Sequence, residues 1–266
     1  MLNNFHTHTA FSDGKNTAEE VVLSAIQKGF DCIGFSDHGY TDYDLSYCLK
    51  DTEGYIKEIK RLRSLYSDKI EILLGVEEDA GCYVNRADFD YIIGSSHYVK
   101  VNGKYYTIDE SLDAFKKCLE MFDGDHIAFA KSYFDSFCSY IKSRRPDIVG
   151  HFDLITKYDE INGYPLLKND EYNKLAEAYV SSVANSQTIF EVNTGAVSRG
   201  YRTSPYPSEN LLHIMKKNGA KVILSSDSHA SDTIDHSFDM ARLLLKDVGF
   251  DHVMTLKCGR FVEAPL

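Results

Sequence analysis

Residues 5–39, FHTHTAFSDGKNTAEEVVLSAIQKGFDCIGFSDHG, contain a strand, a polar loop, a helix and a second strand, in that order. The helix is predicted over residues 17–29, because Thr17 and Glu20 match a capping box, apolar residues recur at helical spacing and Gly29 ends the pattern. The apolar runs on either side are short, as strands are. Two strands joined through a helix are typically parallel, so this stretch predicts an α/β fold.

The same unit repeats along the 266-residue chain. Further strands are predicted within residues 70–79, 89–97, 146–153, 187–195 and 220–229, and further helices over 51–67, 109–123, 126–143, 169–186, 207–218 and 235–248. With the first two strands, the predicted sheet has seven strands, mostly joined by crossover helices. A parallel sheet of this kind closes into a barrel, and the length suits one domain over residues 1–266.

The composition argues against several classes of function. A formal charge of −11 disfavours nucleic acid or anionic lipid as the main partner. The six cysteines include no C-x-x-C pair, so we expect reduced thiols rather than a disulfide framework or zinc ribbon. No apolar run reaches the roughly 20 residues of a membrane helix, and no signal peptide is recognisable at the N-terminus. We therefore expect a cytoplasmic protein without a membrane partner.

Metal-capable side chains follow six of the seven predicted strands. They are His6 and His8 with nearby Asp13, then His38, Glu77, His97, His151, and finally Asp227 with His229. In a parallel barrel the carboxyl ends of the strands surround one mouth, so these residues would converge on a single site. They exceed the needs of one tetrahedral ion and predict two or three divalent ions, with Glu77 able to bridge two of them. Zinc, manganese and iron all accept such mixed ligands.

The remaining histidines serve as an internal comparison. His126, His213, His236 and His252 fall in predicted helices, at their edges or at the start of a strand. We interpret them as surface or packing residues.

Seven segments together resemble the ordered motifs of the PHP superfamily, named for polymerase and histidinol phosphatase. They are FHTHTAFSDG (5–14), GFSDHG (34–39), GVEED (75–79), GSSHYV (94–99), GHFDLI (150–155), EVNTGAVSRGYRTSPYP (191–207) and LSSDSH (224–229). The resemblance spans most of the chain and is greatest to the histidinol-phosphate phosphatase branch. It implies a distorted seven-stranded (β/α) barrel and a phosphatase that hydrolyses L-histidinol phosphate in histidine biosynthesis.

The resemblance also implies a trinuclear metal centre. Carried over residue by residue, it assigns His6, His8, Glu77 and Asp227 to one ion, Glu77, His97 and His151 to a second, and Asp13, His38 and His229 to a third. In some relatives a histidine occupies the place of Asp13; the carboxylate supplies a charged ligand there and leaves the metal preference open.

A mechanism and a set of substrate-binding residues follow as hypotheses. A hydroxide that bridges two ions would attack phosphorus in line. Asp227 is the first candidate for proton transfer, with His229 and His38 as alternatives. Arg199 is the natural partner for the phosphate, with Arg202 and Lys157 as possible helpers. Asp79 or Glu191 would suit the ammonium group of the substrate.

Other functions remain open at this point. The chain could hydrolyse another small phosphomonoester, act on nucleic-acid ends as a nuclease-like domain beside a polymerase, or bind metal without turnover. A carbon–nitrogen hydrolase with a related barrel is a further alternative, but such enzymes more often use a lysine-bridged metal pair.

Overall fold

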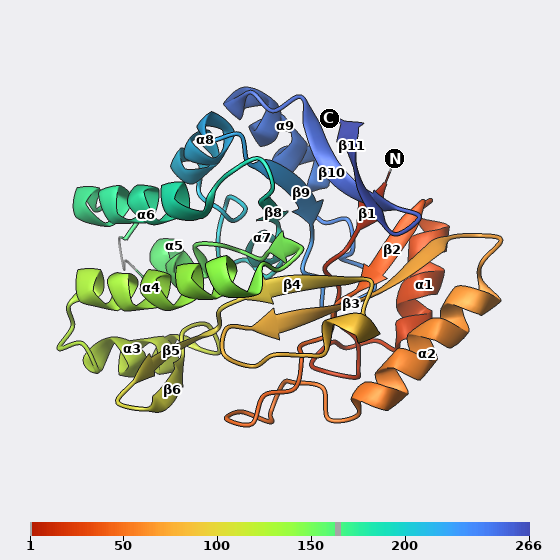
Figure 1. Ribbon diagram of the computed structural model, residues 1–266, viewed down its shortest axis with the longest axis horizontal. Coiled ribbons are helices and arrows are strands. Elements are labelled where there is room, and N and C mark those ends of the chain that lie inside the picture. Colours follow the sequence, from red (N-terminus) through yellow and green to blue (C-terminus); the bar gives the residue numbers. More distant parts are fainter. Residues whose placement is uncertain (1, 163–165) are drawn as a thin grey trace.

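A computed structural model of the protein describes residues 2–162 and 166–266, and among these a curled sheet of nine strands lies at the centre with helices around it (Figure 1). In spatial order the strands are β1 (Asn3–Asn4), β2 (Cys32–Phe35), β3 (Glu71–Asp79), β4 (Tyr91–Ser95), β7 (Ile148–Val149), β8 (Ile189–Asn193), β9 (Lys221–Ser225), β10 (His252–Lys257) and β11 (Arg260–Pro265). The first eight are parallel, and β11 is antiparallel to β10. The α/β class expected from the sequence is confirmed.

The sheet is larger than the seven strands predicted. All seven are present as β1 to β4 and β7 to β9, in sequence order across the sheet. The extra pair, β10 and β11, forms a hairpin that extends the sheet beyond β9. Most residues of β11 are exposed, so no run of apolar residues marks this strand in the sequence.

The two sides of the sheet meet at the carboxyl ends of β1 and β9. Thr7 pairs in parallel with Ser228, and the His8 N–H donates to the Ser228 carbonyl oxygen at 2.8 Å. This contact brings the segment that carries His6 and His8 against the segment that carries Asp227 and His229.

Seven long helices match the predicted ones to within a few residues at each end. They are α1 (Ala18–Gln27), α2 (Thr52–Leu65), α3 (Leu112–Glu120), α4 (His126–Arg144), α6 (Asp170–Val183), α8 (Glu209–Lys217) and α9 (Phe238–Val248). The capping box of α1 is present: the Glu20 N–H donates to Thr17 Oγ1, and the Thr17 N–H donates to Glu20 Oε2. Unpredicted short elements are a hairpin of β5 (Tyr98–Val101) and β6 (Lys104–Thr107), the one-turn helices α5 (Asp159–Asn162) and α7 (Gly195–Ser198), and 3₁₀ turns η1 (Arg86–Asp88) and η2 (Leu154–Thr156).

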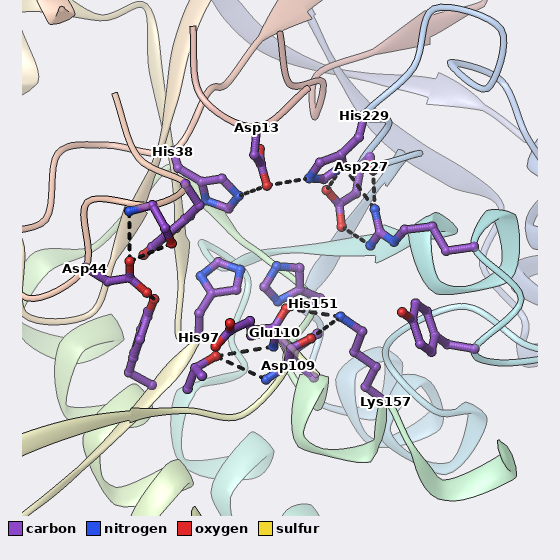
Figure 2. Close-up of a pocket in the computed structure, with 17 residues that line it drawn as sticks. Asp13, His38, Asp44, His97, Asp109, Glu110, His151, Lys157, Asp227 and His229 are labelled. Carbon is purple, nitrogen blue, oxygen red and sulfur yellow. Dashed lines mark hydrogen bonds and ion pairs between the residues drawn. The ribbon is translucent and has the colours of Figure 1, made fainter. Parts of the chain in front are cut away.

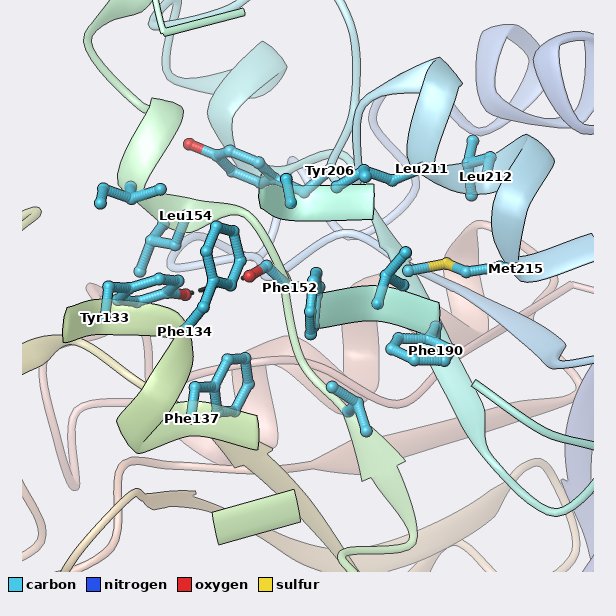
Figure 3. Close-up of a cluster of buried hydrophobic side chains, with 14 of the residues drawn as sticks. Tyr133, Phe134, Phe137, Phe152, Leu154, Phe190, Tyr206, Leu211, Leu212 and Met215 are labelled. Carbon is cyan, nitrogen blue, oxygen red and sulfur yellow. Dashed lines mark hydrogen bonds between the residues drawn. The ribbon is translucent and has the colours of Figure 1, made fainter. Parts of the chain in front are cut away.

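An aromatic core fixes β7 and β8 against the helices on one side of the sheet (Figure 3). Phe134 and Phe137 of α4 pack on Phe152, which follows β7, and Phe152 makes an edge-to-face contact with Phe190 of β8. All four are fully buried. Truncation of such a side chain typically costs about 3–5 kcal/mol. The core therefore fixes the position of β8, which carries Glu191, and of β7, which is followed by His151.

Among the described helices, none combines the length and apolar character needed to cross a bilayer.

Candidate metal centre

A cavity of about 300 Å³ opens at the carboxyl ends of the strands (Figure 2). Six of the predicted metal-binding residues line it: Asp13, His38, His97, His151, Asp227 and His229. His6, His8 and Glu77 lie beneath them and are at most 1% exposed. The structure thus brings all nine residues to one site.

Glu77, on β3, lies between two groups of histidines. One carboxylate oxygen, Oε2, lies 3.2 Å from His6 Nε2, 3.5 Å from His8 Nε2 and 2.9 Å from His38 Nδ1. The other, Oε1, lies 3.0 Å from His151 Nε2 and 3.5 Å from His97 Nε2. This division of the two oxygens is the arrangement expected of a carboxylate that bridges two cations.

His6 and His8 lie between two carboxylates, those of Glu77 and Asp227. Asp227 Oδ1 lies 3.6 Å from His6 Nε2 and 3.2 Å from His8 Nε2. Two ligands of a tetrahedral zinc ion, each about 2.0–2.1 Å from the metal, are about 3.3–3.4 Å apart. The four separations between these two histidines and the two carboxylates, 3.2–3.6 Å, are close to the edges of such a tetrahedron.

The third group lies nearer the solvent. Asp13 Oδ2 lies 3.7 Å from His38 Nε2 and 3.3 Å from His229 Nε2, and Asp13 Oδ1 lies 3.8 Å from His8 Nδ1. These four side chains can surround one ion. His8 and His38 each turn one ring nitrogen toward this group and the other toward Glu77, so they lie between the predicted ligand sets.

Several buried polar atoms at this site have no hydrogen-bond partner among the described residues. They are His6 Nε2, both ring nitrogens of His8, Glu77 Oε2 and His151 Nδ1. An unpaired buried polar atom normally costs about 1–3 kcal/mol, and such atoms are rare in folded proteins. Two of these nitrogens, His6 Nε2 and His8 Nε2, face the unpaired oxygen Glu77 Oε2, at 3.2 and 3.5 Å. Imidazole nitrogens and carboxylate oxygens are suitable donors for a divalent ion, so the residues present fit a metal centre.

Neighbouring carboxylates and imidazoles shift the pKa values of the buried histidines in opposite directions. Burial disfavours a charged His6, but Glu191 and the other nearby carboxylates raise its pKa well above the usual value. For His8, burial together with His229 and His38 lowers the pKa to about 3. His8 is therefore neutral at physiological pH, the state in which imidazole binds a metal.

The carboxylates of the centre are held in the ionised state. Burial alone would raise the pKa of Glu77, but His6 and its neighbours lower it well below the usual range. Burial also opposes ionisation of Asp227, and Arg199 and His6 outweigh it, so the pKa of Asp227 is lowered as well. The site thus offers negatively charged oxygens without an energetic cost of deprotonation at neutral pH.

Asp227 is constrained from several sides. Its backbone adopts a left-handed conformation with φ of 48°, which is strained for a residue other than glycine. Arg199 donates to its carboxylate oxygen Oδ2 and to its carbonyl oxygen, both at 3.0 Å. A Cβ on Gly195 would lie 2.8 Å from Asp227 Oδ2, so a side chain at position 195 would displace the carboxylate.

The loop that carries Asp13 is tied to the residue before His38. The buried carboxylate of Asp37 accepts hydrogen bonds from the Thr9 N–H at 2.8 Å and from Ser12 Oγ at 2.6 Å. Asp37 therefore fixes the turn after His8 relative to the end of β2.

Asp79 and Glu191, expected near the mouth as partners for an ammonium group, lie behind the predicted ligands instead. Glu191 is fully buried and accepts from His6 Nδ1 at 2.6 Å and from the His151 N–H at 3.0 Å. Asp79 is 4% exposed and accepts from His97 Nδ1 at 3.0 Å. Both carboxylates orient predicted ligands, the usual arrangement around metal-bound histidines. Strand alternation could have indicated this for Asp79, which shares a face of β3 with Glu77.

The three predicted phosphate-binding residues have different positions. Arg199 lines the cavity beside Asp227 and His229. Lys157 also lines it, with Nζ bound to the Asp109 carbonyl oxygen at 2.5 Å. Arg202 is 3% exposed and is not among the residues that line this cavity.

The guanidinium of Arg202 instead donates to Thr156 Oγ1 at 2.7 Å and lies over the Tyr206 ring. This placement gives Arg202 no direct route to a substrate in the cavity.

The outer wall of the cavity contains residues that sequence reasoning did not identify. It includes the acidic side chains Asp44, Asp109 and Glu110 and the aromatic side chains Tyr47 and Tyr201, together with Tyr98. The Tyr98 hydroxyl donates to Asp44 Oδ2 at 2.7 Å. These residues lie on loops and the β5–β6 hairpin, whose placement no periodic pattern predicts.

The four remaining histidines lie apart from the centre. His126 begins α4, His213 is on α8 in an ion pair with Glu209, His236 precedes α9 and His252 begins β10. The described cavity lining contains none of them, which fits their interpretation as surface or packing residues.

The curled parallel sheet and the buried cluster of histidines and carboxylates at its carboxyl edge define a class of α/β proteins able to hold divalent metal ions. Residues 4–195, more than half of the chain, match the PHP domain model. The chain belongs to the PHP domain family.

Two curated relatives and one solved structure are similar over most of the chain. A Schizosaccharomyces pombe protein named "Probable histidinol-phosphatase" is 27% identical, over 91% of this chain and 84% of its own length. The histidinol-phosphatase of Lactococcus lactis is 25% identical, over 94% of this chain and 93% of its own length. The crystal structure of histidinol phosphate phosphatase from L. lactis, complexed with zinc, L-histidinol and phosphate, superposes with a TM-score of 0.71 at 21% identity and covers 98% of both chains.

Proposed function

We propose that this protein is a metal-dependent histidinol-phosphatase that hydrolyses L-histidinol phosphate to L-histidinol and phosphate. The observation that carries the proposal is the Glu77 carboxylate, whose two oxygens face two separate groups of histidine nitrogens inside a cavity that also contains Arg199. The names of the relatives supply the substrate. The fold shared with the L. lactis structure over 98% of the chain supports treating β1 to β4 and β7 to β9 as the seven-stranded barrel of one domain.

The residues that would hold the metal ions are the nine already described. We assign one ion of zinc, manganese or iron to each of the three groups of side chains, and Glu77 would be shared between two of these ions. Bound there, the ions would act as Lewis acids on the phosphoryl oxygens and would lower the pKa of a bound water.

Asp227 is the candidate proton acceptor. Its lowered pKa keeps the carboxylate ionised, which is the state that can take a proton from the attacking water. In the reaction water adds to phosphorus, the ester P–O bond breaks, and the proton finally resides on the alcohol oxygen. His229 lies beside Asp227, and His38 lies beside Asp13. These two histidines are the alternatives for returning the proton.

Arg199 is the candidate phosphate-binding residue. Arg199 is partly exposed in the cavity. Its guanidinium is fixed by hydrogen bonds to the carboxylate and to the carbonyl oxygen of Asp227. A guanidinium forms strong charge-assisted hydrogen bonds with a phosphate dianion. Lys157 lies on the same wall and is the second candidate.

The acidic outer wall suits the other end of the substrate. Asp44 and Glu110 line the cavity with Tyr47 and Tyr201. Carboxylates and aromatic rings together favour a cationic, ring-containing group over a neutral one. An L-histidinol moiety has an ammonium group and an imidazole, so it would match this wall.

The test is phosphate release from a panel of phosphomonoesters by protein whose metal content has been measured. We expect kcat/KM for L-histidinol phosphate to exceed that for p-nitrophenyl phosphate, and activity to disappear with a strong chelator. If the generic ester is as good a substrate, the assignment of histidinol phosphate is wrong although the metal centre stands. Release from nucleic-acid ends instead would favour the nuclease-like alternative.

A further inference from the structure

A chain of hydrogen bonds joins the wall of the cavity to one predicted metal ligand. Tyr47 Oη donates to Asp79 Oδ2 at 2.8 Å. The same carboxylate oxygen lies 3.0 Å from His97 Nδ1, and the other, Oδ1, accepts from the His97 N–H at 3.0 Å. Asp79 therefore holds both the backbone and the ring of His97.

The geometry determines which nitrogen of His97 is free. Asp79 can accept but not donate, so the Nδ1 beside it carries the hydrogen, and in the neutral ring Nε2 then has the lone pair. His97 Nε2 points toward Glu77 Oε1 at 3.5 Å, the side on which a metal ion would lie. If the contact with Asp79 were lost, the ring could rotate or adopt the other tautomer, and neither state supplies a well-placed lone pair.

Tyr47 contacts a second predicted ligand. Its ring packs edge-on against His38, with the centroids 4.6 Å apart, and it lines the cavity. His38 follows β2, whereas His97 follows β4. Tyr47, from the segment between β2 and α2, therefore touches the cavity, the ring of one ligand and the carboxylate that orients another.

We propose that Asp79 and Tyr47 are positioning residues that hold His97 in its Nδ1-protonated tautomer, and that they link the segment of residues 39–50 to metal binding at the Glu77–His97–His151 group. The proposal rests on the metal centre of the proposed function. Outer partners of metal-binding histidines typically change metal affinity by 10–100-fold when mutated.

The experiment follows the release of zinc from the zinc-loaded full-length protein into increasing concentrations of a chromophoric chelator. Tyr47→Phe removes one oxygen and keeps the ring on His38. In the parent, three donors share the Asp79 carboxylate: Tyr47 Oη, the His97 N–H and His97 Nδ1. Asp79→Asn leaves one acceptor oxygen for these three donors. We expect one equivalent of zinc to be bound about 10-fold more weakly in Tyr47→Phe and up to about 100-fold more weakly in Asp79→Asn. Activity lost at limiting zinc should return at saturating zinc.

Tyr140→Phe is the matched control. Tyr140 is buried, whereas Tyr47 is half-buried, and the Tyr140 hydroxyl donates to Glu78 Oε1 at 2.7 Å; Glu78 faces away from the predicted ligands and pairs with Arg144. This control removes a tyrosine–carboxylate hydrogen bond of similar length from the neighbouring residue of the same strand. We expect it to retain zinc as the parent does.

The outcomes are distinct. Zinc release from Tyr47→Phe that matches both the parent and Tyr140→Phe overturns the positioning proposal and leaves the metal centre intact. Equal weakening in Tyr47→Phe and Tyr140→Phe also overturns it, because the effect would then be a general loss of stability. A parent protein that binds no divalent ion would defeat the metal centre itself, and the positioning role with it. If Asp79→Asn does not fold, Tyr47→Phe decides alone.

Discussion

Replacing Glu77 by glutamine removes one negative charge from the middle of five imidazoles while preserving the size of the side chain. The two oxygens of Glu77 lie 2.9–3.5 Å from five ring nitrogens. A cation bound by these nitrogens would lie no farther than about 3 Å from the Glu77 oxygens, and for unit charges at that separation the Coulomb energy at an effective dielectric constant of about 20 is about 5 kcal/mol. A neutral amide keeps part of this attraction through its carbonyl dipole, so we expect a loss of about 4 kcal/mol in metal binding. At about 1.4 kcal/mol per factor of ten, this corresponds to roughly a thousand-fold weaker binding.

The assay combines equilibrium dialysis with elemental analysis and steady-state phosphate release from L-histidinol phosphate. Glu77→Gln should hold at least one ion fewer per chain than the parent and should lose nearly all turnover, while circular dichroism remains that of a folded α/β protein. Glu78→Gln provides the control, because it removes the same charge one residue away, at a carboxylate that pairs with Arg144. That control should unfold at a lower temperature but keep its metal. A Glu77→Gln variant with the parent's metal content and turnover would refute the bridging role.

Three further predictions test other parts of the site. Arg199→Ala should lower kcat/KM for L-histidinol phosphate by a factor of about 100 and reduce its advantage over p-nitrophenyl phosphate, since a charge-assisted contact with a dianion is worth a few kcal/mol; steady-state kinetics on both esters will show whether it does. Glu191→Gln should weaken zinc binding by about 10–100-fold in chelator competition, because His6 Nδ1 loses its charged acceptor; unchanged affinity would contradict the orienting role. Burial raises the pKa of Asp159 from 3.8 to about 6, so the free energy of unfolding should fall as pH rises through this interval. Asp159→Asn should remove that fall, and urea unfolding above pH 6 should show the variant to be about 1–2 kcal/mol more stable than the parent, after allowance for the partial solvent exposure of Asp159. A parent whose free energy of unfolding is constant between pH 4 and 6 would count against this.

The parts of the fold that follow from local periodicity could be predicted from the sequence. The helix at residues 18–27 has the capping box that the sequence predicts. The strands that end near His38, Glu77 and His97 lie where apolar runs with polar ends predict them. The hairpin of β5 and β6 and the strand β11 could not be predicted. Their residues are mostly exposed or half-buried, so they show neither a helical nor a buried-strand pattern.

The convergence of the metal-capable residues could also be predicted, because it depends only on parallel strands with their carboxyl ends at one edge. The partners of these residues could not. Arg202 and Arg199 are three positions apart in one loop, yet Arg199 lines the cavity and Arg202 is buried against Thr156. No periodic structure spans the two, so the sequence contains no information on which of them faces the cavity.

The three consecutive acidic residues of β3 show where the limit of sequence reasoning lies. Glu77, Glu78 and Asp79 have the same charge, but successive side chains of a strand point to opposite faces. Glu77 and Asp79 accordingly face the cavity side, where one contacts five histidines and the other holds His97. Glu78 faces the helices and pairs with Arg144 and Tyr140. Alternation alone therefore separates the residue with a structural role from the two at the metal centre. It cannot separate the bridge from the positioning residue, because that depends on Tyr47 and His97, which reach β3 from loops after two other strands.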